Sequence, residues 1–77
     1  MNINDFIVSF AEQFVDTGAE DLSPETKFKE LEEWDSLIVL SIIAMVNSEY
    51  DVTITGRDIR EAETISDLYD CVVELKG

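Results

Sequence analysis

Residues 36–48, SLIVLSIIAMVNS, are uncharged and mostly apolar, and they constrain the possible folds more than any other feature of the chain. Acidic residues are dense on both sides of this segment, yet no charge follows Asp35 until Glu49. A helix that is apolar on more than one side is either deeply buried or uses its second side to contact another molecule. A chain of 77 residues is too short to enclose every side of a central helix.

This helix is predicted to run from about Asp35 to Tyr50, and its apolar residues form two separate sides at helical spacing. The side expected to face the core contains Val39, Ile42, Ile43, Val46 and Tyr50. The second side, bordered by Ser36 and Asn47, contains Leu37, Leu40 and Ala44. We expect this second side to meet a partner, although coverage by the other helices is the alternative.

Helical patterns also precede this segment. Apolar residues recur at helical spacing from Phe6 to Val15, with Asn4 as the expected cap and Gly18 as the expected left-handed stop. A long connection follows, in which Ser23-Pro24 is expected to start a short helical segment. Its apolar residues are spaced to lie over the core and are Phe28, Leu31 and Trp34.

Two capping boxes of the form T-x-x-D predict the remaining helices. Thr55 opens a short third helix that ends near Glu61, and Thr64 opens a last helix. The apolar face of the last helix contains Ile65, Leu68, Tyr69, Val72 and Leu75. The segment 52–55 is interpreted as a linker, because no partner strand is evident. The prediction is one domain, residues 1–77, an all-α bundle of three longer helices and one short helix with a long structured first loop.

Charge and composition exclude several functions. The 18 acidic and 5 basic residues give a net charge of −13, which disfavours nucleic acid and favours a basic protein partner, or simply maintains solubility. The chain has no histidine and no EF-hand pattern, so we expect neither catalytic residues nor a metal site. The single Cys71, expected to be buried and inert, suits a cytoplasmic location. The apolar run is too short to span a membrane.

Ser36 lies where the second apolar side begins, at the predicted helix N-terminus. Asp-Ser before an apolar run is a common helix cap, so capping alone could explain it. A helix N-terminus also offers unpaired N–H groups that stabilise a phosphate ester on such a hydroxyl. A serine nucleophile would need a base, and neither a histidine nor a Ser-x-x-Lys arrangement is present.

These residues resemble the acyl carrier protein family over nearly the whole chain. Asp35-Ser36-Leu37 matches the family's D-S-L motif, and the segments 23–31, 49–59 and 64–72 follow the family's order of loops and helices. The resemblance implies a stand-alone, monomeric, non-enzymatic carrier. A phosphopantetheinyl transferase would move 4′-phosphopantetheine from coenzyme A to Ser36, and the arm would carry acyl thioesters to loading and transferring enzymes. The residues that would line an acyl cavity, or simply the core, are Val39, Ile42, Ile43, Val46 and Ile59.

The chain departs from the family in the charge of the second helix. Places where fatty-acid carriers usually show acidic residues hold Ile38, Ser41, Asn47 and Ser48. The expected partner surface, less charged and more apolar than usual, consists of Leu37, Ile38, Leu40, Ser41, Ala44 and Asn47. This favours a specialised pathway over housekeeping fatty-acid synthesis. An unmodified adaptor and a peptidyl carrier remain alternatives.

Overall fold

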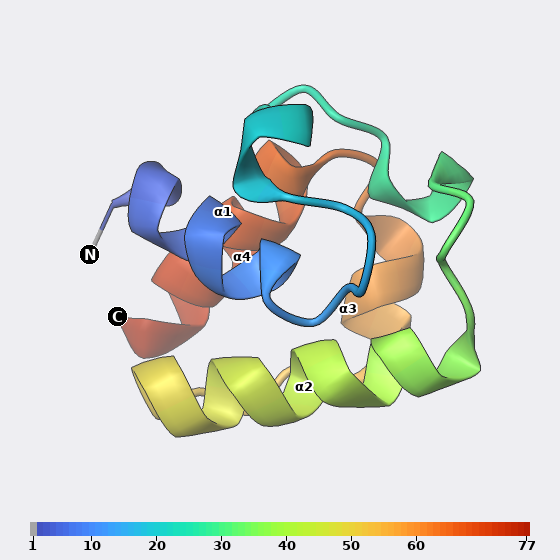
Figure 1. Ribbon diagram of the computed structural model, residues 1–77. Helices are drawn as coiled ribbons and strands as arrows, with labels where there is room; N and C mark the ends of the chain where they lie inside the picture. Colours follow the sequence, from blue (N-terminus) through green and yellow to red (C-terminus); the bar gives the residue numbers. More distant parts are fainter. Residues whose placement is uncertain (1) are drawn as a thin grey trace.

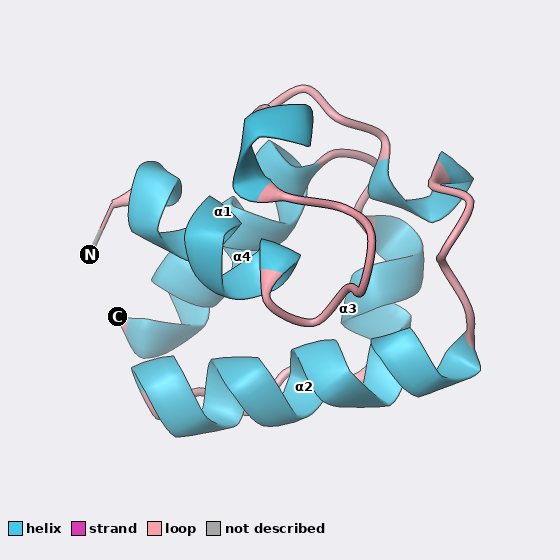
Figure 2. Ribbon diagram, viewed as in Figure 1, coloured by secondary structure: helices cyan, strands magenta, loops and turns pink. Residues whose placement is uncertain are grey.

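Each α-helix within residues 2–77 begins at a polar side chain that binds a free N–H of the first turn. The computed structural model describes residues 2–77, and that part of the chain contains helices and loops without a strand (Figures 1 and 2). The helices are α1 (Ile3–Ala11), α2 (Ser36–Tyr50), α3 (Gly56–Glu61) and α4 (Ile65–Lys76), with two 3-10 turns, η1 (Ala19–Asp21) and η2 (Phe28–Glu30). The all-α prediction, with its short third helix, is confirmed.

Both T-x-x-D capping boxes form as predicted. The Thr55 hydroxyl accepts the Asp58 N–H at 3.1 Å, and the Asp58 carboxylate accepts the Thr55 N–H at 2.9 Å. The Thr64 and Asp67 pair repeats this arrangement at the start of α4. Reciprocal caps of this kind depend only on residues three positions apart, which explains why the pattern alone located both helix starts.

The predicted ends of the first helix were wrong. Asn2, not Asn4, caps α1 through a 2.9 Å bond from the Asp5 N–H. The helix ends at Ala11 instead of continuing to Gly18, whose φ of −98° is not left-handed. The cause is tertiary: Phe14 turns inward to stack on Trp34, with ring centroids 6.5 Å apart.

The first loop is structured, but by turns rather than by a helix at Ser23-Pro24. Ser23 and Thr26 form a tight turn between η1 and η2. The carbonyls of Pro24 and Thr26 then accept the N–H groups of Ser66 and Ile65, at 2.9 and 3.1 Å. The loop therefore satisfies free donors in the first turn of α4 and is held against that helix.

The core lies between α2 and the other three helices, and α2 contacts all of them (Figure 1). Phe28 from the loop is fully buried and meets Phe10 edge-on at 5.6 Å. The core side of α2 is wider than the predicted stripe, since Met45, which lies outside that stripe, is also buried. The predicted apolar face of α4 was wrong at Leu75, which is 54% exposed in the last turn of the helix. The largest fully buried side chains are Phe6, Phe10, Phe28, Ile42, Ile54, Ile59, Ile65, Leu68, Val46 and Val72.

Two substitutions two residues apart on α2 test this division between core and surface. Ile42→Ala should lower the free energy of unfolding by about 2–5 kcal/mol, because it leaves a cavity in a fully buried site. Leu40→Ala should change it by less than about 0.5 kcal/mol, because that side chain is exposed. Urea denaturation followed by circular dichroism measures both, and equal losses would contradict the assigned helix face.

Candidate functional site

The start of α2 is capped by Asp35. Its backbone is extended (φ −155°, ψ −178°), and its Oδ1 accepts the Ile38 N–H at 2.9 Å. This bond provides the capping that Ser36 could also have provided. The structure therefore excludes the simplest non-functional explanation of Ser36, namely that its hydroxyl caps the helix.

Ser36 is the first residue of α2 and is exposed. Within residues 2–77, no hydrogen bond includes its hydroxyl, and the N–H groups of Ser36 and Leu37 are also without a protein acceptor. The site thus combines a reachable hydroxyl with helix N-terminal donors that favour an anion. This chemistry fits a phosphodiester on Ser36, and the flexible arm beyond it would extend into solvent.

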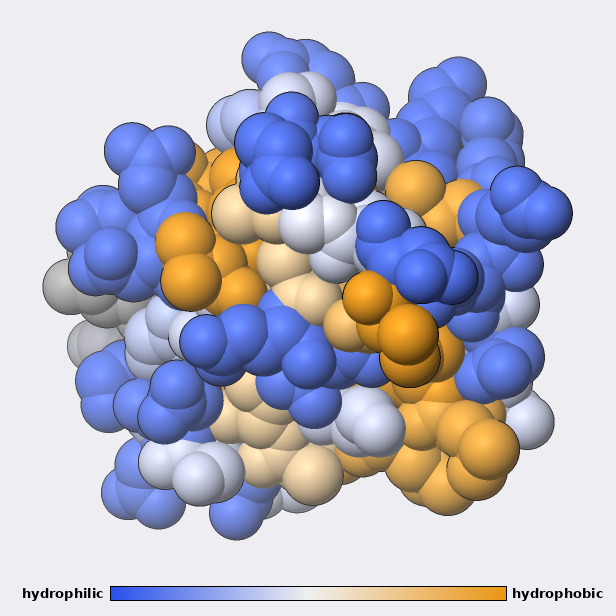
Figure 3. Space-filling model, viewed as in Figure 1, coloured by the Kyte–Doolittle hydropathy of each residue, from blue (hydrophilic) through white to orange (hydrophobic). Residues whose placement is uncertain are grey.

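Apolar side chains lie beside this hydroxyl on the surface of α2. Leu37 is 71% exposed, Leu40 is 62% exposed, and Ala44 is exposed one turn further along. In Figure 3 an apolar surface covers the N-terminal end of α2, at the lower right. The side of α2 that was predicted to remain uncovered by the other helices is therefore exposed to solvent. Ile42 and Val46, on the opposite side, are fully buried.

The other residues predicted for the partner surface are less uniform. Ile38 and Ser41 are partly buried, and Ile38 packs against the core. Asn47 is exposed, and its amide donates to the Thr53 hydroxyl at 3.1 Å. Four of the six predicted residues, Leu37, Leu40, Ala44 and Asn47, are therefore exposed, whereas Ile38 and Ser41 are partly buried.

The residues predicted to line an acyl cavity are part of the core. Ile42, Val46 and Ile59 are buried, whereas Val39 and Ile43 are partly buried and pack against the same cluster. A hollow of about 160 Å³ lies elsewhere, between α3 and α4, and its lining includes none of these five residues. The residues of the hollow are Asp58, Glu61, Ala62, Asp67 and Cys71. An acyl cavity therefore stays a prediction.

Cys71 is partly buried at this hollow, instead of fully buried as predicted. Burial, together with the negative charge of Asp58, raises the pKa of the Cys71 thiol above its ordinary value. The thiol is therefore protonated at neutral pH, and a thiol is a much weaker nucleophile than a thiolate. The raised pKa of Cys71 therefore favours an unreactive side chain, in line with the expectation from the sequence.

Glu33 holds the loop that follows α1 beside the start of α2, and sequence reasoning did not find it. Its carboxylate accepts the Val15 N–H at 2.9 Å, the Asp16 N–H at 3.0 Å and the Thr17 hydroxyl at 2.7 Å. These bonds, that of Thr17 foremost, lower the pKa of the Glu33 carboxyl. The partners are 16 to 18 residues away in the sequence, so no local pattern indicates the contact.

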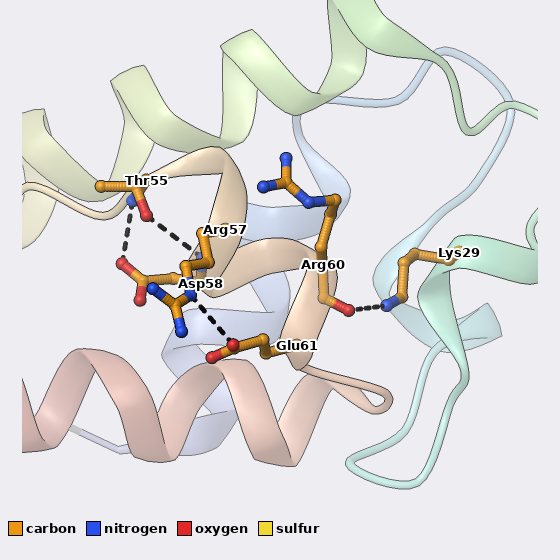
Figure 4. Close-up of polar contacts among 6 residues, drawn as sticks. All are labelled: Lys29, Thr55, Arg57, Asp58, Arg60 and Glu61. Carbon is orange, nitrogen blue, oxygen red and sulfur yellow. Dashed lines mark hydrogen bonds and ion pairs between the residues drawn. The ribbon is translucent and has the colours of Figure 1, made fainter.

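Two lysines also donate to backbone carbonyl oxygens near the ends of other helices. Lys29 donates to the carbonyl oxygen of Arg60 at 2.6 Å, in the last turn of α3, and Arg57 pairs with Glu61 at 3.0 Å (Figure 4). Lys76 similarly donates to the carbonyl of Tyr50 at the end of α2, at 2.9 Å. Cations at helix C-termini satisfy free carbonyls and oppose the negative end of the helix dipole.

The family model described as phosphopantetheine attachment site matches residues 5–72, and the chain belongs to this acyl carrier protein family. No solved structure gave a significant match to the chain. Members of the family bind 4′-phosphopantetheine covalently, typically act as carriers without catalysis of their own, and depend on partner enzymes. None of the helices described is both long and apolar enough to cross a lipid bilayer.

The lowered pKa of Glu33 leads to a prediction about stability and pH. An ionised carboxylate with a lowered pKa stabilises the fold above its ordinary pKa of 4.5, and this stabilisation is lost as the pH falls through the lower folded-state value. Glu33→Gln removes it, so the difference in Tm between wild type and Glu33→Gln should be largest near neutral pH and shrink in acid. Thermal unfolding over a pH series measures this difference.

The matched control is Glu32→Gln. The Glu32 carboxylate is exposed, lies next to Glu33 in the sequence and makes no hydrogen bond within residues 2–77. This control should show no comparable change in its Tm difference. A Tm difference for Glu33→Gln that stays constant over the pH series would mean that its carboxylate contributes nothing through ionisation.

Proposed function

We propose that Ser36 is the attachment serine and that the protein carries acyl groups as thioesters between partner enzymes. The observation that supports this most directly is the exposed hydroxyl of Ser36, which is left without a protein partner because Asp35 caps the helix. When bound, the 4′-phosphopantetheine arm supplies a terminal thiol for the thioester. Tethering a substrate in this way raises its effective concentration at the partner's site.

Loading of the arm requires one substitution at phosphorus. The Ser36 oxygen forms a bond to the phosphorus that carries the pantetheine group of coenzyme A. The bond from that phosphorus to the bridging oxygen of the diphosphate breaks, 3′,5′-ADP leaves, and a base of the transferase takes the hydroxyl proton. The free N–H groups of Ser36 and Leu37 give the resulting phosphodiester favourable surroundings.

We further propose that the partners recognise α2 mainly through apolar contact, as in a specialised pathway such as secondary-metabolite or cell-surface polymer assembly. The proposed contact residues are Leu37, Ile38, Leu40, Ser41, Ala44 and Asn47. The absence of charge from residues 36–48 supports this, because the nearby acidic residues can then lie only at the border of the contact surface. Acidic residues at the border steer a basic partner and set its orientation, while burial of apolar surface provides affinity.

Modification by a transferase tests the attachment site. The unmodified protein, coenzyme A, magnesium and a broad-specificity phosphopantetheinyl transferase are incubated, and the intact mass is recorded. Wild type should gain one arm, and Ser36→Ala should gain none. Ser48→Ala, at a second exposed serine of α2, is the matched control and should be modified like wild type. A wild type that several transferases leave unmodified would instead favour an unmodified adaptor.

A charge on the exposed side of α2 tests the partner surface. Leu40→Glu should leave the circular dichroism spectrum unchanged, because the side chain is 62% exposed. It should lower the rate of transfer to or from the cognate partner at least tenfold, which corresponds to the loss of about 1.4 kcal/mol at an interface hot spot. Unfolding of the variant would show that this side belongs to the core, and an unchanged rate would place the contact elsewhere.

A further inference from the structure

Val15 is the most exposed large apolar side chain among those described. It is 92% exposed and lies in the loop between α1 and η1, although the residue before it is buried. Solvent exposure of one valine is ordinary in itself. This valine, however, is held by its backbone at a defined place, against the residues that lead into the proposed attachment site.

The position of Val15 is set by two contacts with residues 33 and 34. Its N–H and that of Asp16 donate to the two carboxylate oxygens of Glu33, at 2.9 and 3.0 Å. The preceding Phe14 stacks on Trp34 with centroids 6.5 Å apart. The loop is therefore anchored on the two residues that precede Asp35, and the Val15 side chain extends from it into solvent.

Distances along the chain limit how far this loop can lie from Ser36. Ser36 follows Glu33 by three residues, which span at most about 11 Å. A standard interface covers roughly 800 Å² of each partner, a disc with a radius of roughly 16 Å. In Figure 3 apolar surface lies both at the N-terminal end of α2 and above it, where the loop after α1 passes in Figure 1, and both areas face the same way.

The charges near this surface indicate the chemistry of the partner. Exposed carboxylates lie next to Val15 in the sequence at Asp16 and beside the attachment serine at Asp35, and Glu12 and Glu32 are exposed close by. Each basic residue of the chain lies in other segments. An apolar contact with an acidic border fits an enzyme surface that presents an apolar residue bordered by lysines or arginines.

We propose that Val15 is a docking residue for the phosphopantetheinyl transferase that modifies Ser36, and that Glu33 is a positioning residue that holds Val15 in place. This rests on the proposed function of Ser36. Val15 thereby adds the loop after α1 to a contact surface otherwise made by Leu37 and Leu40 on α2. The enzyme thus contacts both the loop after α1 and the start of α2, which the hydrogen bonds of Glu33 hold together.

The test measures the kinetics of modification with coenzyme A and a transferase that modifies wild type. Val15→Ala should raise KM about fivefold or more, as for a truncated interface contact, and leave kcat near wild type, because Val15 lies away from the reacting hydroxyl. Val73→Ala is the matched control. It truncates an exposed valine of α4 towards the C-terminus, at the other end of the molecule from the start of α2 (Figure 1), and should leave KM unchanged.

Glu33→Gln should also raise KM, and Val15→Ala should add nothing further in the double variant, because the loop is then no longer held in place. Circular dichroism confirms that each variant is folded before kinetics are compared. A Val15→Ala variant with the KM of the Val73→Ala control would overturn the docking role. Multiplicative effects in the double variant would overturn the positioning role. Either result, with wild type still modified, would leave the assignment of Ser36 intact.

Discussion

The hydrogen bond from the Ile38 N–H to the Asp35 carboxylate is the interaction on which the rest of the site depends. Asp35 lies just outside the helix and provides the cap, so Ser36 enters α2 as its first residue with an exposed hydroxyl. If Ser36 were the cap, its oxygen would accept a backbone N–H and be less available for chemistry. Asp35 thus takes the capping role, and the Ser36 hydroxyl next to it is left without a protein partner.

Electrostatics explain why so small a bundle needs its loop contacts. Eighteen acidic residues repel one another on the surface, which opposes compactness. Few basic residues are present to offset this, and Lys29 and Lys76 are used at helix ends, where each satisfies a carbonyl. Glu33 makes the converse contact, because its negatively charged carboxylate accepts hydrogen bonds from three donors of a loop. Both signs of charge therefore hold connections in place, while an aromatic cluster around Phe10 and Phe28 provides the burial.

Local patterns predicted most of the architecture. The helical spacing of apolar residues identified α2 and its two sides, and the boxes at Thr55 and Thr64 located the starts of α3 and α4. The first helix was predicted too long, because Phe14 continues the helical spacing in sequence but leaves the helix to stack on Trp34. Leu75 likewise continues the apolar spacing of α4 in the sequence, but it lies beyond the end of the core and is exposed.

By itself, the sequence determined where α2, α3 and α4 start, which side of each of these helices is apolar, and that an Asp-Ser-Leu motif begins α2, because all three depend on residues close together in the chain. Only the tertiary structure decided that Glu33 holds the loop at Val15 against the segment before α2, and that the carbonyls of Pro24 and Thr26 meet the start of α4. Both contacts join residues that the chain separates widely. A polar group finds such a partner only after packing of the core has brought the two segments together.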